Sequence, residues 1–127
     1  MREIIFRAKI KWNGNHFFAG DWVYGYYLVN ENIDEHKIHS MGEYGVMSAH
    51  IIDEKTLGQF TGLQDKKGTG IYEGDLIKVC ENNNGNLEVV FRNAYVGGWN
   101  LRYKDEPLLS LGARRKADLE IVGNIFD

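Results

Sequence analysis

The sequence contains one cysteine and one proline, and it has no long apolar run. The lone Cys80 excludes an intramolecular disulfide and any metal site built from several cysteines. Its apolar neighbours favour a small buried hydrophobic residue. No apolar run approaches the length of a membrane span, and the start Met1-Arg2-Glu3 lacks the apolar region of a signal peptide. We therefore expect a soluble intracellular protein.

An excess of positive charge is also absent. Lys and Arg number 15 against 18 Asp and Glu, which gives a formal net charge of -3. Both halves of the chain are slightly acidic, so the electrostatic footprint of a protein that binds duplex nucleic acid is not present. The length of 127 residues corresponds to one ordinary domain, or to one domain with a small appendage.

Glycine and aromatic residues are plentiful. The 15 glycines and 13% aromatic residues are typical of short strands joined by turns. Residues 3–12 alternate between apolar residues such as Ala8 and Ile10 and basic residues such as Arg7 and Lys9. This period of two predicts a half-buried strand.

Further strands are predicted along the rest of the chain, most of them bounded by turns rich in glycine or asparagine. They cover residues 16–19, 22–29, 39–52 (one or two strands), 76–81, 87–92 and 99–103, and a last strand that contains Leu119, Ile121 and Ile125. A hairpin turn is predicted at 13–15 and a loop at 30–35. One helical turn is predicted at 54–57, with Asp53 as its N-cap and Gly58 after its end.

Strands that recur about every ten residues with glycine turns predict a mainly β protein, containing a small β-roll or barrel. A change of character near Asp53 suggests two parts. Residues 1–52 would form an N-terminal β-rich subdomain, all-β or α+β, and residues 53–127 an SH3-like C-terminal subdomain. The alternative is one compact unit.

Residues 58–75, GQFTGLQDKKGTGIYEGD, are the most distinctive stretch of the chain. Glycine permits positive φ, so we expect Gly62, Gly68 and Gly74 to shape turns. The carboxylate of Asp75 is expected to accept hydrogen bonds from backbone amides that the last turn frees. The glycine spacing fits neither a dinucleotide fingerprint nor a phosphate loop, and no helix follows. This stretch is therefore expected to define the fold.

Several segments together carry a resemblance to a known family. They are Thr61-Gly62-Leu63, Asp65-Lys66, Gly68, Ile71-Tyr72-Glu73-Gly74-Asp75 and Val122-Gly123-Asn124-Ile125, with Phe6-Arg7-Ala8 near the start. In these segments the chain resembles the YopX family of phage and prophage proteins, most strongly within residues 58–75. The resemblance implies a small, mostly β domain with an SH3-like C-terminal part that works in a bacterial cytoplasm. It implies no catalytic residue.

His36 and His39 lie beside Asp34 and Glu35 and are candidate metal ligands. Two imidazoles spaced three apart meet on one face of a helix, and carboxylates could complete a zinc shell. In a strand the same spacing points the two rings to opposite faces. A metal-dependent hydrolase or nuclease that uses His36, His39 and these carboxylates is therefore the alternative to a binding protein.

Trp22, Tyr24 and Tyr26 fall on the same face of a predicted strand, with Trp12 and Phe17-Phe18 nearby. Exposed rings in a row can stack single-stranded bases. Rings in a sheet core or in an oligomer interface instead pack against cross-strand neighbours. Because basic residues near the rings are few, we favour core or oligomer contact over base stacking.

The remaining charged residues give weaker signals. The basic cluster at 114–116 reads as a solvated turn, with an anion or nucleic-acid contact as the alternative. Asp65, Glu73 and Asp75 have turn positions and no neighbouring His or Ser that would complete a catalytic set. Tyr72 joins Asp65 and Glu73 as a candidate for a binding surface.

Together these observations predict a non-enzymatic binding or interaction protein that needs no cofactor and no metal. A protein partner is favoured over nucleic acid, a homo-oligomer is an open alternative, and no membrane contact is expected. The candidate binding residues are Trp22, Tyr24, Tyr26, Asp65, Tyr72 and Glu73.

Overall fold

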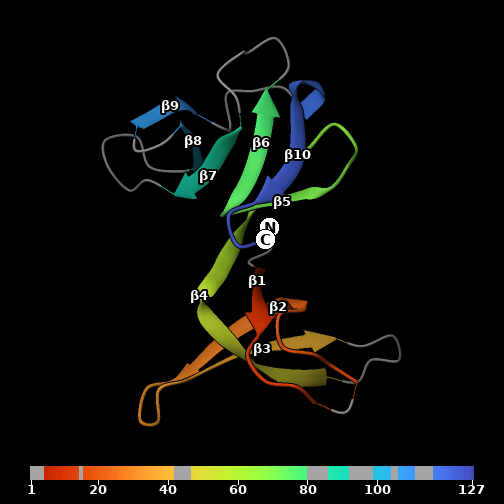
Figure 1. Ribbon diagram of the computed structural model, residues 1–127, viewed down its shortest axis with the longest axis vertical. Coiled ribbons are helices and arrows are strands. Elements are labelled where there is room, and N and C mark those ends of the chain that lie inside the picture. The colour runs from red at the N-terminus through yellow and green to blue at the C-terminus, as the bar shows by residue number, and fades with distance from the viewer. Residues whose placement is uncertain are drawn as a thin grey trace. The chain divides into compact units, whose positions relative to one another are not determined.

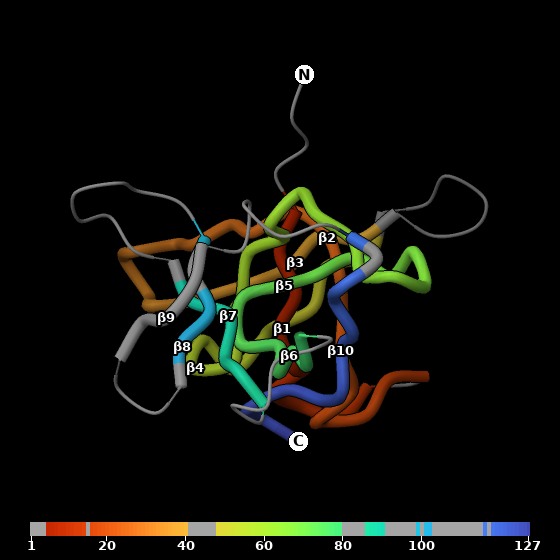
Figure 2. Tube along the Cα trace, turned by 90° about the horizontal axis from the view of Figure 1, so that it is seen from above, coloured from red at the N-terminus to blue at the C-terminus, as the bar shows by residue number. Residues whose placement is uncertain are grey.

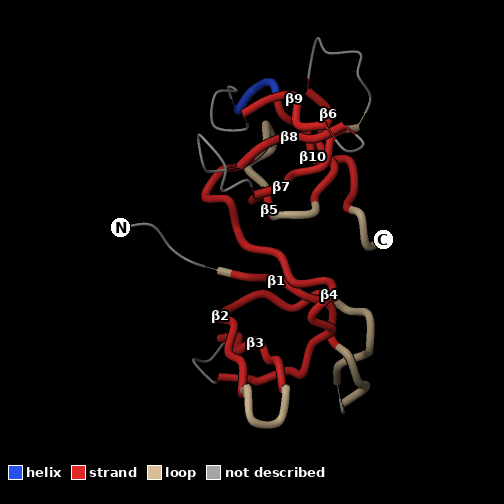
Figure 3. The backbone as a smooth tube through the Cα atoms, turned by 90° about the vertical axis from the view of Figure 1, so that its left-hand side faces the viewer, coloured by secondary structure: helices blue, strands red, loops and turns tan. Residues whose placement is uncertain are grey.

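The computed structural model describes residues 5–14, 16–41, 47–79, 86–91, 99–103, 106–110 and 116–127. These residues are mainly strand and form antiparallel sheets (Figure 1), which confirms the predicted mainly β class. The strands are β1 (Phe6–Ile10), β2 (Trp22–Asn30), β3 (Glu35–Met41), β4 (Met47–Gln64), β5 (Gly70–Tyr72), β6 (Asp75–Val79), β7 (Leu87–Phe91), β8 (Trp99–Tyr103), β9 (Glu106–Ser110) and β10 (Leu119–Asn124). The short blue segment in Figure 3 is a 3-10 helix at Lys116–Asp118.

The chain divides into two compact units, Met1–Gln59 and Phe60–Asp127. Strand β4 contributes to both, with residues 47–59 in the first unit and residues 60–64 in the second. The division lies within β4, further along the chain than the predicted boundary at Asp53.

Strands β1 to β4 build the first unit by antiparallel pairing. β1 pairs with β2 and β4, and β3 likewise pairs with β2 and β4. One side of this arrangement is the core, made of Ala8, Ile10, Val23, Ile38 and Ile52. The predicted alternation of β1 is confirmed in its apolar half, since Ala8 and Ile10 are buried.

Gly25 lies in the middle of β2, where the strand changes its pairing partner. Before it, Tyr24 pairs with Arg7 of β1, and after it, Tyr26 pairs with His39 of β3. The φ of Gly25 is 156°, and a Cβ atom on this residue would lie 2.1 Å from the carbonyl oxygen of His39. Only glycine permits so close an approach of the two backbones.

The predicted helical turn after Asp53 is wrong, because the whole segment belongs to β4. The register with β1 shifts here, so that Arg7 pairs with Gly58 and Lys9 with Asp53. Inside this bulge the Thr56 hydroxyl donates to the Asp53 carbonyl (2.7 Å) and accepts from the Lys9 N–H (2.8 Å). A one-turn helix is marginal by itself, whereas the bulge satisfies backbone groups on both strands.

The predicted strand at residues 16–19 is also wrong, since bends and turns run through residues 16–20 and β2 begins at Trp22. Side chains take up backbone donors in this segment. Asn13 Oδ1 accepts from the Ala19 N–H (2.8 Å). Local bonds of this kind compete with a sheet ladder for the backbone. The loop predicted within 30–35 is confirmed as a turn at 31–34.

The second unit contains a sheet with the strand order β10-β6-β7-β8-β9. Neighbouring strands of this order lie side by side in Figures 1 and 2. Within the described residues the order is an open row, and the predicted SH3-like barrel is not confirmed. Strand β9 was not predicted. The core of the unit consists of Ile71, Ile77, Val79, Leu87, Val89, Trp99, Leu101 and Leu119.

Some predicted features lie outside the described residues. They are Cys80, the third residue of the turn at 13–15, and the first two residues of the basic cluster at 114–116.

The replacement Gly25→Ala should destabilise the chain by about 3 kcal/mol or more, through backbone strain and a steric clash with β3. Urea denaturation followed by circular dichroism measures this loss. The matched control is Gly14→Ala, whose added Cβ would meet only Phe17 Cδ2, at 4.0 Å. Equal stability of the two variants would contradict the proposed close approach.

Candidate functional site

The alternation of β2 places four large side chains on one side of the strand. They are Trp22, Tyr24, Tyr26 and Leu28, called here the β2 face. Tyr24, Tyr26 and Leu28 expose 47%, 55% and 54% of their surface. Surface hydrophobic residues are normally scattered singly, and a contiguous patch more often marks an interaction site.

Two basic side chains of β1 lie over the indole ring of Trp22. Arg7 Cζ is 4.6 Å and Lys9 Nζ is 5.3 Å from its centroid. The register of the two strands brings them there, with Lys9 opposite Trp22 and Arg7 opposite Tyr24. Contacts between a cation and a ring face hold the indole against β1. Trp22 is therefore less available for stacking a base than Tyr24 is.

Strand β3 supplies the neighbours on the other side of the β2 face. His39 pairs with Tyr26, and Lys37 pairs with Leu28. The Lys37 ammonium forms an ion pair with Glu35 at 2.8 Å. The β2 face therefore lies between cationic or titratable side chains from both adjoining strands.

His36 and His39 do not come together, because the strand geometry of β3 points them to opposite sides. His36 lies instead beside residues of two other segments. Its Nε2 atom is 2.9 Å from Asp34 Oδ1 and 2.5 Å from Glu54 Oε2. Its Nδ1 atom is 2.5 Å from the hydroxyl of Tyr27. The sequence pointed to Asp34 as a neighbour, but it gave no signal for Glu54 or Tyr27.

The environment of Tyr27 keeps its hydroxyl neutral. Burial raises the pKa of the phenol, and the charges of Glu54 and Asp34 raise it further. Tyr27 also packs against Phe6, a partly buried residue beside the core, with ring centroids 5.6 Å apart. The residue therefore acts as a fixed hydrogen-bonding partner of His36.

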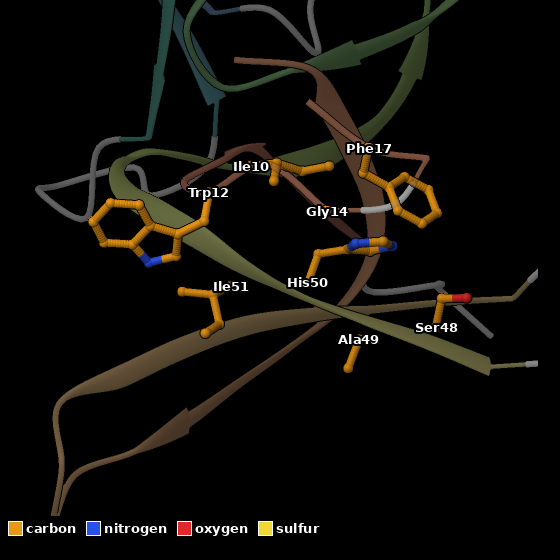
Figure 4. A pocket seen from close by; sticks show the side chains of 8 residues that line it. All are labelled: Ile10, Trp12, Gly14, Phe17, Ser48, Ala49, His50 and Ile51. Atoms are coloured by element: carbon orange, nitrogen blue, oxygen red, sulfur yellow. The ribbon is translucent and has the colours of Figure 1, made fainter. Parts of the chain in front are cut away.

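A recess of about 440 Å³ lies elsewhere in the first unit. Figure 4 shows Trp12 at one end of it and Phe17 at the other, above His50. The Phe17 ring contacts the His50 ring edge-on, with centroids 4.3 Å apart. Burial lowers the pKa of His50, which favours the uncharged imidazole at neutral pH. This lining suits an apolar group.

Asp65 is enclosed in the second unit and only 2% exposed. Its Oδ1 accepts hydrogen bonds from the N–H groups of Lys67 (2.9 Å) and Thr69 (3.0 Å), and its Oδ2 accepts from that of Ile121 (3.2 Å). Desolvation by burial acts to raise the pKa of Asp65. The three backbone N–H donors and the charge of Lys67 outweigh it, so the pKa is lowered.

The other candidate residues of the glycine-rich stretch also make contacts within the unit. Asp75 is 2% exposed, and its Oδ2 accepts from the Tyr72 N–H at 2.8 Å. The Tyr72 ring packs against Phe60 with centroids 5.2 Å apart, and Glu73 is half-buried. The turn glycines have positive φ: Gly62 at 83°, Gly68 at 83° and Gly74 at 92°. These residues do not form an exposed row of large side chains like that of the β2 face.

Comparison with known proteins agrees with the resemblance seen in the sequence. A family model described as YopX protein matches residues 6–127. No curated protein matches the chain. No helix in the described part of the chain has the length and apolar character needed to cross a bilayer.

The replacement Asp65→Asn should lower the free energy of unfolding by about 2–3 kcal/mol near neutral pH, because a buried acceptor of three N–H groups becomes partly a donor. The pKa of Asp65 is lower in the folded chain than its ordinary 3.8. Its contribution is therefore fully present above that value and is lost as the pH falls through the folded-state pKa.

Urea denaturation between about pH 6 and pH 2 measures this dependence. The difference between the wild-type chain and Asp65→Asn should shrink as the pH is lowered. Asp21→Asn, at an exposed position, should differ little from the wild type throughout. A difference for Asp65→Asn that does not change with pH would contradict the assignment.

Proposed function

The chain belongs to the YopX family, and we propose that it is a phage- or prophage-encoded binding protein with no catalysis of its own. It acts in a bacterial cytoplasm, and its partner is a protein. Its C-terminal part is related to SH3-like barrels. The single observation that carries the proposed binding function is the exposed row of the β2 face.

The composition of the β2 face and its surroundings supports a protein partner. Tryptophan, tyrosine and arginine are the residues most enriched among those that dominate protein–protein binding energy. Tyr24 and Tyr26 offer large, rigid surfaces that lose little conformational entropy on binding. Arg7 lies over the ring of Trp22, and this contact supports the two tyrosines from one end of the row. Leu28 extends the row with an aliphatic side chain.

The charges beside the β2 face indicate the chemistry of this partner. Lys9 and Lys37 lie next to the row, from the strands on either side of it. A partner segment with apolar side chains flanked by carboxylates would complement both the row and its charged borders. Single-stranded nucleic acid is less favoured, because Leu28 offers no ring to a base.

An activity built on His36 and His39 together is not favoured, because their rings lie on opposite sides of β3. Purified protein that shows a turnover sensitive to mutation would nevertheless replace the proposed function with an enzymatic one.

The double variant Tyr24→Ser/Tyr26→Ser should weaken partner binding at least about 30-fold, since two central aromatic contacts are lost. Affinity capture from a phage-carrying host lysate identifies the partner, and calorimetry with the purified partner measures the change. The matched control is Val122→Ser, an exposed apolar position (43%) in the other unit, which should leave binding unchanged.

Three other outcomes would contradict the proposal. Equal affinity of the double variant and the wild type would remove the β2 face as the binding surface. Captured single-stranded nucleic acid, with an affinity that falls steeply with salt, would change the class of partner. Self-association of the wild type that the double variant loses would assign the face to a homo-oligomer.

A further inference from the structure

We propose that Asp34, His36 and Glu54 form a binding site for one divalent cation, with Zn²⁺ as the best match. The three residues come from different segments of the first unit. Asp34 ends the turn between β2 and β3, His36 lies in β3, and Glu54 lies in the bulge of β4. This site is separate from the β2 face and does not depend on the proposed function.

The three ligand atoms already converge. The oxygens of Asp34 and Glu54 and a ring nitrogen of His36 all lie within 4.8 Å of one another. In a tetrahedral zinc site, bonds of about 2.0–2.1 Å place neighbouring ligand atoms roughly 3.3 Å apart. His36 Nε2 lies 2.9 Å and 2.5 Å from the two carboxylate oxygens. The two nitrogen–oxygen distances therefore need to lengthen by less than about 1 Å to admit the cation.

The side chains that must move are free to do so. The Asp34 and Glu54 side chains are 86% and 50% exposed, whereas the His36 side chain is 17% exposed. The fixed ligand is thus the imidazole, and the two carboxylates can adjust around it.

The hydrogen bond of His36 with Tyr27 leaves the correct nitrogen for a metal. In the tautomer that carries its proton on Nδ1, the ring donates to the Tyr27 hydroxyl oxygen (2.5 Å) and the lone pair of Nε2 points at the two carboxylates. Three electron-rich atoms then face one another, an arrangement that a cation stabilises. A partner that holds the other nitrogen of a ligating histidine is a regular feature of metal sites.

The charge of the ligand set matches a divalent cation. Asp34 and Glu54 both approach the Nε2 atom of His36. Their two carboxylates carry a charge of −2, which a divalent cation bound to them and to the imidazole balances.

The donor types select the metal. One imidazole and two carboxylates suit zinc, which binds nitrogen and oxygen ligands together, better than they suit magnesium or calcium, which prefer oxygen alone. A pocket of about 490 Å³ lined by Asp34, His36 and Glu54 adjoins the site. The pocket leaves room for water as the remaining ligand. Because the three ligands come from different segments, bound zinc would link the β2–β3 turn to the β4 bulge.

Calorimetric titration of the chelator-treated full chain with ZnCl₂ tests the site. We expect one equivalent of zinc to bind. The melting temperature should rise by about 5–10 °C at a hundredfold excess over the dissociation constant. His36→Ala and Glu54→Gln should each weaken binding more than tenfold. Tyr27→Phe, which removes the positioning hydroxyl, should weaken it about tenfold. Co²⁺ should give the visible absorption of a tetrahedral complex.

Each control variant replaces a residue of the same type at a position outside the proposed site. His39→Ala removes a histidine from the same strand, and Glu31→Gln removes an exposed carboxylate from the same turn. Both should bind zinc as the wild type does. Glu54→Gln alters a half-exposed side chain and decides the question if His36→Ala does not fold. Zinc binding that neither His36→Ala nor Glu54→Gln weakens, or no binding by the wild type at millimolar zinc, would overturn the proposal.

Discussion

The close approach of β2 and β3 at Gly25 is the constraint on which the first unit depends. The strand pairs with β1 up to this residue and with β3 after it. Because no side chain intervenes, the His39 carbonyl can lie where a Cβ atom would otherwise be. The alternation of the strand continues through the change of partner. Tyr24 and Tyr26 therefore stay on one side while their neighbours come from two different strands.

The second unit depends on a different device, the enclosed carboxylate of Asp65. Its two oxygens bind N–H groups of the adjacent turn, at Lys67 and Thr69, and the N–H group of Ile121 in β10. A single side chain thus joins segments that are far apart in the sequence. Residues of the glycine-rich stretch, which best identifies the family, make hydrogen bonds of this kind within the unit. They therefore indicate how the unit folds more than what it binds.

Some features of the fold and of the candidate site could be predicted from the sequence, and others could not. Alternation in β1 and β2 predicted which side chains share a face, because period two is a local property of a strand. Whether that face is exposed depends on which strands pack on it. Asp53 indicated a helical turn. The segment forms a bulge instead, and Lys9, which pairs with Asp53 there, lies in another strand. An isolated glycine within a strand pattern is a signal of close backbone approach, and it could have identified Gly25.

By itself the sequence determined the strand-rich class, the turn glycines and the family, since these follow from local backbone preferences and short motifs. Tertiary structure decided which polar groups meet. It separated His36 from His39 and brought His36 to Glu54 and Tyr27. It also placed Arg7 over Trp22. Such contacts depend on the register between strands, which is fixed by the packing of the whole unit and is not encoded in any one segment.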